Sequence, residues 1–446
     1  MARFLDIFTV WNLLLVSIAI NLSFILKLSV DNQPLIAGDG ALKDELSLQG
    51  THLSVSSSTS YSFSSSAPSV DGDDERVINL DHGDPTMYER FWQEMGDEAT
   101  IIIPGWQSMS YFSDITNPCW FLEPEFAKQI VRLHKIVGNA VTENRQIVVG
   151  TGSTQLFQAV LYALAPQDAE QPISVVSAAP FYSSYPAITD CLKSGLYRWE
   201  GDATHFRKEG PYIELVTSPN NPDGFVRRSV LNRTEGILVH DLAYYWPQYT
   251  PISSPADHEI MLFTVSKTTG HAGMRIGWAL VKNKEVAKRM VKYIELNSIG
   301  VSKDSQLRAS KILDVVSDNC ESSANNKSLF EFAYHVMAER WQLLRAAVKV
   351  SGLFSLPEFS PGFCSFRGRF FESQPAFAWL KCEEPIEDCE SFLRFNKILT
   401  RSGKYFGVGV QYVRISLLDR DDNILLFINR LSNITIDDVY QHLKER

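Results

Sequence analysis

The sequence predicts an α/β protein with a mainly parallel central sheet and a smaller α+β lobe. From about residue 77 to residue 300, short apolar runs of strand length alternate with stretches of helical pattern, which is typical of a parallel sheet covered by helices. After about residue 315 the pattern changes to a long amphipathic helix, a strand, another helix and a last strand. A chain of 446 residues is long enough for a large core and a second lobe.

Six short apolar runs in the first part are predicted to form the strands of the central sheet. These runs are residues 146–150, 173–177, 212–217, 236–240, 261–265 and 276–281. A helix is predicted at 153–164, directly after the first run. In the smaller lobe, strands are predicted at 376–380 and 413–416.

The segment ahead of the folded part is predicted to be a membrane anchor followed by a tether. Residues 7–26 carry no charged side chain and are about long enough to span a bilayer as a helix. No clean cleavage site follows this run, which is longer than the apolar part of most signal peptides. Residues 1–30 are therefore predicted to be a retained anchor. The serine-rich residues 31–76 are predicted to be a disordered linker, because they hold too few large apolar side chains to offset the entropy of ordering.

The remaining chain, residues 77–446, is predicted to be the functional domain. Its large part is placed at about 120–305, and its small part combines about 77–119 with 306–446. The charges on the two sides of the apolar run, Arg3 and Lys27, are too balanced to set the orientation of the anchor.

Charge and cysteine usage exclude some classes of partner. The formal net charge is -10 and no long basic run is present, which argues against nucleic acid. The six cysteines form no C-x-x-C and no Cys/His cluster of zinc spacing, so no metal site is predicted. Scattered cysteines in a long chain fit reduced thiols facing the cytosol. The alternative is a lumenal protein with three disulfides, for which Asn232, Asn326 and Asn433 would be glycosylation acceptors.

Lys267 is the residue on which the functional interpretation depends. It follows the apolar run 261–265, where an ammonium is costly unless it is paired or used covalently. An amine with a lowered pKa forms Schiff bases with carbonyl compounds, pyridoxal 5'-phosphate (PLP) among them. The structural alternative is a lysine that reaches past the strand end to solvent.

Two turns that follow predicted strands supply further candidates. Residues 150–155, Gly-Thr-Gly-Ser-Thr-Gln, open a helix, where small residues and free backbone N–H groups favour a phosphate. A simple Gly/Ser/Thr helix start explains them equally well. Residues 218–224 form a Pro- and Gly-rich turn in which Asn221 could donate to the 3-oxygen of a pyridine ring.

A carboxylate and two arginines complete the predicted constellation. Asp241 follows the strand 236–240 and could pair with a pyridinium nitrogen, which would keep the ring able to take up electrons. Tyr244 could share the 3-oxygen. Arg275 could bind the phosphate as a fork of donors, and Arg414 of the small lobe could bind the substrate α-carboxylate. The structural alternatives are that Asp241 caps the segment that follows it and that Arg414 is a surface arginine on a strand.

These motifs resemble, in this order, those of fold type I PLP-dependent aminotransferases: Asn-Pro, Asp-x-x-Tyr, Ser-Lys, an arginine eight residues on, and Arg-Ile-Ser. The match is closer to one plant group, the tryptophan aminotransferase-related proteins. The motifs that carry this resemblance lie at 81–86, 109–114, 119–124, 149–155, 217–224, 240–247 and 270–273. The similarity runs from about residue 77 to about residue 430.

The resemblance implies a reaction and a set of partners. L-Tryptophan would pass its amino group to a 2-oxo acid such as pyruvate, and the product indole-3-pyruvate would be the first intermediate of a route to auxin. It also implies a homodimer in which Tyr111 reaches the cofactor phosphate of the partner subunit. The anchored start of the chain resembles membrane-bound members, so we expect a single-pass protein of the endoplasmic reticulum with its catalytic domain facing the cytosol.

The resemblance also assigns roles to individual residues of the cofactor site. Ser153 and Thr154 would lie in the phosphate cradle, and Thr264 and Ser266 would bind the cofactor beside Lys267. Tyr182 is expected to stack on the cofactor ring, with Phe181 as the close second candidate, because the sequence does not say which of the two faces the cofactor.

Two other functions remain open at this point. A PLP-dependent carbon–sulfur lyase of the alliinase type shares this catalytic region, but those enzymes carry a cysteine-rich module, and residues 31–118 contain no cysteine. A membrane-tethered module that binds PLP or an amino acid without turnover is the third alternative; the pairing of Lys267 with Asp241 argues against it.

Overall fold

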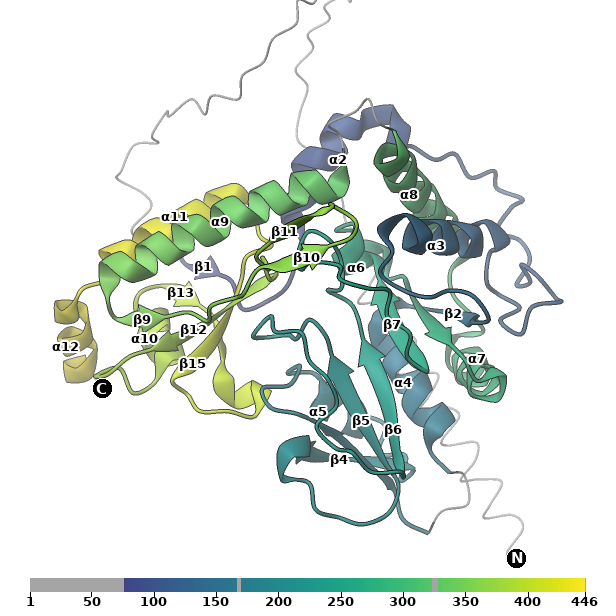
Figure 1. Cartoon of the computed structure of the whole chain (residues 1–446), viewed down its shortest axis with the longest axis horizontal. Coiled ribbons are helices and arrows are strands. Elements are labelled where there is room, and N and C mark those ends of the chain that lie inside the picture. The colour runs from purple at the N-terminus through teal and green to yellow at the C-terminus, as the bar shows by residue number, and fades with distance from the viewer. Residues whose placement is uncertain (1–75, 167–169, 323–327, 446) are drawn as a thin grey trace, which may run out of the picture. The chain divides into compact units, whose positions relative to one another are not determined.

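The computed structural model describes residues 76–166, 170–322 and 328–445. These residues form a seven-stranded sheet covered by helices and a four-stranded sheet with helices of its own (Figure 1). The predicted anchor and all but the last residue of the predicted linker lie outside the described residues. Within the described ranges, no helix is both long and apolar enough to cross a bilayer.

The large sheet is mainly parallel, as the sequence predicts. Its strand order is β2-β8-β7-β6-β5-β3-β4, and β8 alone of these strands runs antiparallel to its neighbours. The strands are β2 (Gln146–Gly150), β3 (Ile173–Ser177), β4 (Tyr197–Asp202), β5 (Tyr212–Thr217), β6 (Gly236–Asp241), β7 (Ile260–Thr264) and β8 (Gly277–Val281). The six predicted runs correspond to six of these strands within a residue at each end.

Strand β4 is the one that the apolar pattern does not predict. It lies at the edge of the sheet beside β3, and charged residues recur along it at Arg198, Glu200 and Asp202. An edge strand faces solvent and therefore needs few apolar side chains, so no apolar run marks it.

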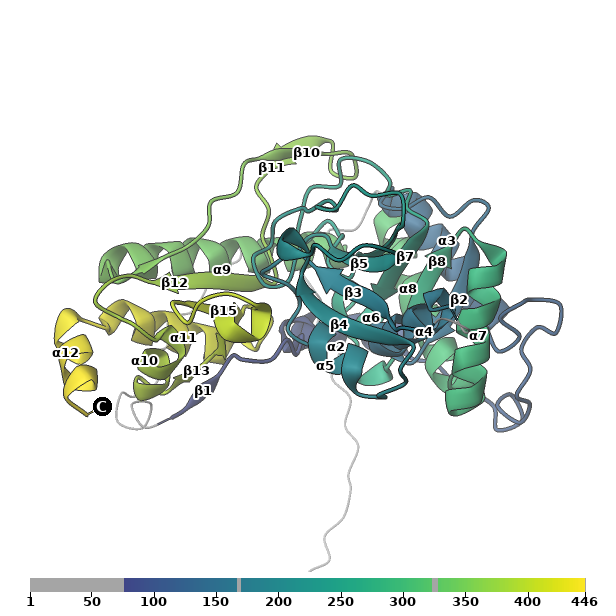
Figure 2. The ribbon, with the colours of Figure 1, turned by 90° about the horizontal axis from the view of Figure 1, so that it is seen from below.

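Helices cover both faces of the large sheet (Figures 1 and 2). On β8, an added Cβ on Gly277 would meet the start of α4 (Gly152–Leu164), whereas the adjacent Trp278 contacts Phe126 of α3 (Pro124–Val137). Because adjacent residues of a strand point to opposite faces, α3 and α4 lie on opposite sides. Helix α7 (Lys284–Ser298) packs with α4, and α8 (Lys303–Glu321) packs with α3.

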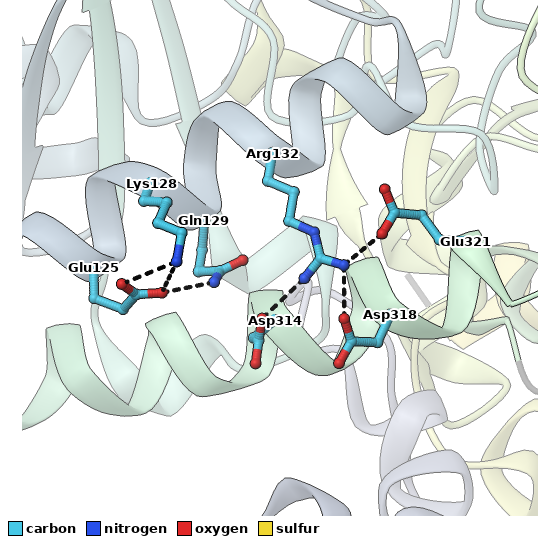
Figure 3. Close-up of polar contacts among 7 residues, drawn as sticks. All are labelled: Glu125, Lys128, Gln129, Arg132, Asp314, Asp318 and Glu321. Atoms are coloured by element: carbon cyan, nitrogen blue, oxygen red, sulfur yellow. Dashed lines mark hydrogen bonds and ion pairs between the residues drawn. The ribbon is translucent and has the colours of Figure 1, made fainter.

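Arg132 joins α3 to α8 through three carboxylates (Figure 3). Its guanidinium lies 2.9 Å from Asp314, 2.7 Å from Asp318 and within ion-pair distance of Glu321. The acidic side chains therefore line the face of α8 that meets α3. The predicted boundary near residue 305 falls at the start of α8, which lies against the large sheet's helices.

The smaller lobe contains the antiparallel sheet β14-β15-β12-β9, a parallel pair β1-β13 and the hairpin β10-β11. Helices α9 and α11 lie side by side along it (Figure 1). The strands are β1 (Ile78–Asn79), β9 (Phe354–Ser355), β10 (Gly362–Cys364), β11 (Arg369–Phe371), β12 (Phe377–Cys382), β13 (Ile398–Leu399), β14 (Arg401–Ser402) and β15 (Tyr412–Ser416). The helices are α9 (Leu329–Ser351), α10 (Cys389–Phe395), α11 (Asp421–Asn433) and α12 (Ile436–Glu445).

Short helical segments connect these elements. They are α2 (Glu89–Met95), α5 (Tyr185–Asp190), α6 (Val265–Thr268) and the 3₁₀ turns η1 (Thr86–Tyr88), η2 (Gly96–Ala99), η3 (Ala203–His205), η4 (Ala272–Met274) and η5 (Gly403–Phe406). The segment that follows β7 begins with the single helical turn α6.

One disulfide bond corrects the prediction of six reduced thiols. Cys382 at the end of β12 is bonded to Cys389 at the start of α10, and both are buried. The turn between these two elements brings the two Cα atoms to 5.5 Å, which is within disulfide reach. The other four cysteines are free thiols, so the alternative of three disulfides is also wrong.

Candidate active site

The site forms where the ends of several strands meet at one edge of the large sheet. The register pairs Asp241 of β6 with Leu262 of β7, and Thr264 at the end of β7 with Gly277 at the start of β8. Gly277 also pairs with Gly150 at the end of β2. Because β8 is antiparallel, its start lies at the same edge as the ends of its neighbours. The segments that follow these strands are therefore brought together, as is common for ligand sites in α/β sheets.

A cavity of about 420 Å³ lies at this edge, between the large sheet and the smaller lobe. Ten of the twelve residues predicted for the site line it: Ser153, Thr154, Tyr182, Asn221, Tyr244, Thr264, Ser266, Lys267, Arg275 and Arg414. The other two predicted residues are Asp241 and Tyr111.

Lys267 lies in the turn α6 with its amine directed at the N-terminal part of the smaller lobe. Thr264 caps this turn by accepting from Ser266 N at 3.2 Å. The Lys267 amine donates to the carbonyl oxygen of Gly83 and lies 6.0 Å from the centre of the Tyr244 ring. Burial lowers the pKa of Lys267 from 10.5 to about 8, with a further contribution from nearby Arg414. A lysine of this kind is partly neutral, and therefore nucleophilic, near neutral pH.

A cradle for an anion is formed by the start of α4 and Arg275. Gly152 has φ +73°, and an added Cβ there would stand 2.5 Å from an Arg275 guanidinium nitrogen. Thr151, the residue before the helix, makes no side-chain cap, while the Gln155 side chain accepts from Thr151 N at 2.8 Å. Ser153 and Thr154 at the start of α4 line the cavity, and no carboxylate pairs with Arg275 among the described residues. The Arg275 guanidinium donates to the Ala272 carbonyl at 2.9 Å through one nitrogen. Helix amides and the remaining guanidinium donors form a site for a phosphate.

Asp241 lies beside the cavity at the end of β6. Its carboxylate accepts from the Tyr185 hydroxyl at 3.0 Å and from the backbone N–H of Ala243 at 3.1 Å. Burial raises the pKa of Asp241, while these two hydrogen bonds lower it. A cation placed against this carboxylate would offset its burial. Tyr185, which also bonds Thr217 at 2.7 Å, is a supporting residue that the sequence analysis missed.

Arg414 enters the cavity from β15 of the smaller lobe. It donates to Asn221 Oδ1 at 3.2 Å and to the carbonyl of Asp81, and its guanidinium lies 4.3 Å from the centre of the Phe377 ring. Its Nε is buried and has no hydrogen-bond partner among the residues that the structure describes. Burial lowers the pKa of Arg414 to about 10. An unpaired buried donor is costly, so this side chain is prepared for an anion.

Tyr244 and Ser266 complete the walls around Lys267. Burial raises the pKa of the Tyr244 hydroxyl well above its ordinary value, so this group is a hydrogen-bond donor at neutral pH. The hydroxyl of Ser266 accepts from that of Thr264 at 3.1 Å. The hydroxyl groups of Thr264 and Ser266 belong to the segment that leads into Lys267.

The two aromatic candidates for stacking occupy different places. Tyr182 lines the cavity, and its ring meets that of Tyr185 edge-on at 5.3 Å. Phe181 is 7% exposed and packs against Trp199, with its backbone N–H bonded to Phe406 O. Tyr182 is therefore the one of the pair that can face a ligand in this cavity.

Tyr111 is not brought to the cavity of its own chain. It lies in the segment between η2 and α3, and 70% of it is exposed. The role predicted for it, contact with the cofactor of a partner subunit, stays a prediction.

Three features of the cavity fit PLP, the cofactor predicted from the sequence. Gly152 leaves room against Arg275 that any larger side chain would fill, which suits a phosphate. Lys267 lines the same cavity as this cradle and as Arg414, whose buried Nε has no acceptor among the described residues. Asp241 supplies a carboxylate of the kind that pairs with a ring nitrogen.

Comparison with known proteins identifies the family. A sequence model of the family described as Allinase matches residues 78–435. Tryptophan aminotransferase-related protein 2 of Arabidopsis thaliana is 61% identical over 426 residues, which cover 95% of this chain and 96% of that protein. The chain belongs to the allinase family. An alliin lyase of Allium cepa var. aggregatum is 36% identical over 352 residues, covering 76% of this chain and 78% of the lyase.

Solved structures show that this allinase-family chain has the fold of type I aminotransferases. A probable N-succinyldiaminopimelate aminotransferase from Thermus thermophilus superposes with a TM-score of 0.57 at 19% identity, covering 80% of this chain and 94% of that one. An identity this low supports the fold alone. The predicted α/β class with an aminotransferase-like architecture is confirmed.

Other residues of the cavity were not predicted from the sequence. Arg401 enters it from β14, and His82, Gly83 and Asp84 form a strap that lies over Lys267. The strap belongs to a motif, residues 81–86, that the family resemblance had already marked. Arg401 carries no such signal, because its two-residue strand is too short to show a pattern.

Proposed function

We propose that this protein is a PLP-dependent aminotransferase that converts L-tryptophan to indole-3-pyruvate, with a 2-oxo acid such as pyruvate as acceptor. The observation that carries the proposal is the position of Lys267. Its amine has a lowered pKa and shares one cavity with an anion cradle at Arg275 and an unpaired buried donor on Arg414. The reaction would be the first step of the indole-3-pyruvate route of auxin biosynthesis.

Bound PLP would supply an electron sink for the carbanion that forms when the substrate loses its α-proton. The residues of the chain would hold the reactants around it. Arg275 and the first amides of α4 would bind the phosphate, and Asp241 would hold the ring nitrogen in its protonated form. Asn221 and Tyr244 would bind the 3-oxygen, and Tyr182 would cover the ring.

Lys267 would hold the cofactor covalently and, once released, act as general base and acid at the substrate α-carbon. Its carbonyl partner Gly83 would keep the free amine beside the reacting carbon, because the strap lies directly over it. Arg414 would bind the α-carboxylate through its guanidinium, so that the α-proton faces the amine. The choice of tryptophan is supported by the names of the relatives.

The experiment is to incubate the purified holo-protein with L-tryptophan and pyruvate and to measure indole-3-pyruvate. The Lys267→Ala variant should form none above background, and phenylalanine and tyrosine in the same assay would rank the donors. A protein that forms no 2-oxo acid from any of the three amino acids would refute the proposal.

A carbon–sulfur lyase is the second candidate, favoured by the match to the Allinase model and by the alliin lyase relatives. It would use the same cavity and the same lysine. Pyruvate released from an S-alkyl cysteine sulfoxide in the absence of an acceptor, without any indole-3-pyruvate from tryptophan, would select this function instead. Ligand binding without turnover of either substrate would select the third alternative, a binding module.

The proposal includes a homodimer in which Tyr111 acts in the partner's site. Its segment exposes large apolar side chains that water does not favour: Ile102, Trp106, Met109, Tyr111, Phe112 and Ile115. Mixing the inactive variants Lys267→Ala and Tyr111→Ala tests the arrangement. If Tyr111 acts between subunits, hybrid dimers contain one intact site and recover activity; if it acts within its own chain, one site carries Tyr111→Ala and the other Lys267→Ala, and activity stays low.

We also propose a single-pass membrane protein of the endoplasmic reticulum with its catalytic domain in the cytosol. The Cys382–Cys389 bond counts against the cytosolic side, because disulfides persist mainly in oxidising compartments. Glycan mapping at Asn232, Asn326 and Asn433 would decide the side. Occupied sites would place the domain in the lumen.

A further inference from the structure

We propose that Arg401 binds the second carboxylate of a dicarboxylic 2-oxo acid, so that acceptors of this class are preferred over uncharged ones of the same length. The inference rests on the proposed aminotransferase function and names the acceptor class for it. Arg401 would then determine specificity, while Arg414 binds the α-carboxylate that every 2-oxo acid carries.

The register of the small sheet places the two arginines side by side. Arg401 of β14 pairs directly with Arg414 of β15 in an antiparallel ladder. Side chains that are directly opposite in such a ladder project from the same face, with their Cβ atoms about 4.5–5.5 Å apart. Two like charges in these positions repel each other, which is unfavourable unless an anion lies between or beyond them.

The contacts of Arg401 leave it available. One guanidinium nitrogen donates to Ser183 Oγ at 3.3 Å, and another lies 3.7 Å from a carboxylate oxygen of Asp81. The side chains of Arg401 and Asp81 are 34% and 38% exposed, and a long ion pair between partly exposed groups contributes little. A substrate carboxylate could therefore replace Asp81 as the partner of Arg401 at small cost.

The contacts of Arg414 differ. It is 3% exposed, held by Asn221 and by the Asp81 carbonyl, and stacked on Phe377. This rigid setting suits the invariant α-carboxylate. The looser and more exposed Arg401 suits a group at the far end of the substrate, which differs between acceptors.

The charges of the cavity leave Arg401 with only the long contact to Asp81 as an anionic partner. Its lining includes four cationic residues, Lys267, Arg275, Arg401 and Arg414, against the single carboxylate of Asp84. In the proposed function, a phosphate would neutralise Arg275 and an α-carboxylate would neutralise Arg414. The indole side chain of the donor is uncharged, so a substrate carboxylate for Arg401 would come from the acceptor.

The test compares two five-carbon acceptors, 2-oxoglutarate and 2-oxopentanoate, which differ at the terminal carboxylate, with pyruvate as a reference. With the full-length holoenzyme and L-tryptophan, the wild type should have the higher kcat/KM for 2-oxoglutarate. Arg401→Gln should lower the ratio of the two kcat/KM values about 10- to 100-fold, mainly through KM, because hydrogen bonds to a charged group are lost. For Arg401→Lys this ratio should lie between those of the wild type and Arg401→Gln, because lysine keeps the charge but cannot make the two parallel hydrogen bonds of a guanidinium.

A matched control and a binding measurement separate this role from a structural one. Arg420→Gln removes a partly exposed arginine that pairs with Glu89 away from the cavity, and it should keep the wild-type ratio. Glutarate, which cannot react, should raise the Tm of the wild-type holoenzyme more than pentanoate does, and Arg401→Gln should abolish this difference. An unchanged acceptor ratio in Arg401→Gln, or a wild type that does not distinguish the two five-carbon acids, overturns the inference.

The tryptophan half-reaction is measured separately, as indole-3-pyruvate formed in a single turnover without acceptor. If the wild type forms it and the acceptor ratio does not depend on Arg401, only the present inference fails. If the wild type forms none, the proposed function fails, and the assignment of an acceptor class fails with it.

Discussion

The amine of Lys267 is surrounded by a backbone carbonyl, the ring of Tyr244 and the guanidinium groups of Arg414 and Arg275. Burial and the two positive charges disfavour the ammonium form, and Asp84 partly restores it. The reactivity of this lysine thus depends on residues from both lobes, although the lysine itself lies at the end of one strand.

The capture of PLP by the cofactor-free protein should depend on pH in a defined way. The folded-state pKa of Lys267 is about 8, below the ordinary 10.5, and the neutral amine is the nucleophile. The rate of capture, followed by cofactor absorbance, should rise about tenfold per pH unit below pH 8 and level off above it. Asp84→Asn should shift the midpoint to lower pH, because Asp84 raises this pKa. A midpoint of the pH dependence near 10.5 would show that burial does not lower the pKa of Lys267.

Gly152→Ala should weaken binding of PLP while the protein stays folded. The backbone at Gly152 has φ +73°, and the added methyl would stand 2.5 Å from an Arg275 nitrogen. Holding an alanine in a left-handed conformation costs the folded state roughly 1–2 kcal/mol whether or not PLP is bound. The added methyl must also displace the Arg275 guanidinium from the cradle, so the Kd for PLP should rise about tenfold or more. Gly273→Ala is the matched control, because nothing lies within 4 Å of its added Cβ. An equal Kd for PLP in the two variants would show that Gly152 is not part of the phosphate site.

At the scale of elements, charge and packing hold α3 against α8 and thereby fix the helices behind the large sheet. Arg132 is the centre of this contact, with Asp314, Asp318 and Glu321 along one face of α8 (Figure 3). These acidic residues recur at helical spacing, so without Arg132 they would repel one another. Arg132 is 28% exposed, and its partners are 36–62% exposed, so solvent screens the contact.

Replacing Arg132 by Met should lower the free energy of unfolding by about 1 kcal/mol, the upper range for exposed ion pairs. The effect should be larger at 0.05 M than at 0.5 M NaCl, because salt screens the unpaired carboxylates. Urea unfolding measures both. Lys128→Met removes a pair within α3 that is more exposed, and it should change stability by less than about 0.5 kcal/mol. Equal effects in both variants would mean that the α3–α8 contact adds nothing.

At the scale of the whole molecule, the cavity depends on both lobes meeting. Arg414 of the small sheet donates to Asn221 of the large lobe, and the strap at Gly83 reaches from β1 to Lys267. Every cavity-lining residue lies C-terminal to Arg76, whose guanidinium bonds Asn423 at 2.5 Å. Activity should therefore reside in the chain from residue 76 onward.

A chain beginning at residue 76 should have the same kcat as the full-length protein, within about twofold, and the same unfolding midpoint. Steady-state kinetics and circular dichroism measure the two quantities. Fractionation of cells that express each form tests the predicted anchor at the same time: the full-length chain should sediment with membranes and the shortened chain should not. If both forms sediment alike, residues 1–30 are not the anchor.

Local sequence pattern predicts the strands of the large sheet and the chemistry at their ends. Apolar runs mark six strands of the large sheet because burial on both faces requires them, and the same reason hides the charged edge strand β4. Lys267, Asp241 and Arg275 stand out because such residues are costly at the ends of buried strands unless they have partners. Each of these signals lies within a few consecutive residues, so it can be recognised without knowing which distant segments it contacts.

The pairing of residues that are distant in the sequence becomes visible in the fold. The register of β14 and β15 places Arg401 beside Arg414, the strap brings the Gly83 carbonyl to Lys267, and Tyr182 rather than Phe181 faces the cavity. The disulfide bond between Cys382 and Cys389 also depends on the fold, because their separation of 7 residues in the sequence does not predict it. Side-chain partnership across the fold depends on strand register and lobe contact, and no periodicity along the chain records either of them.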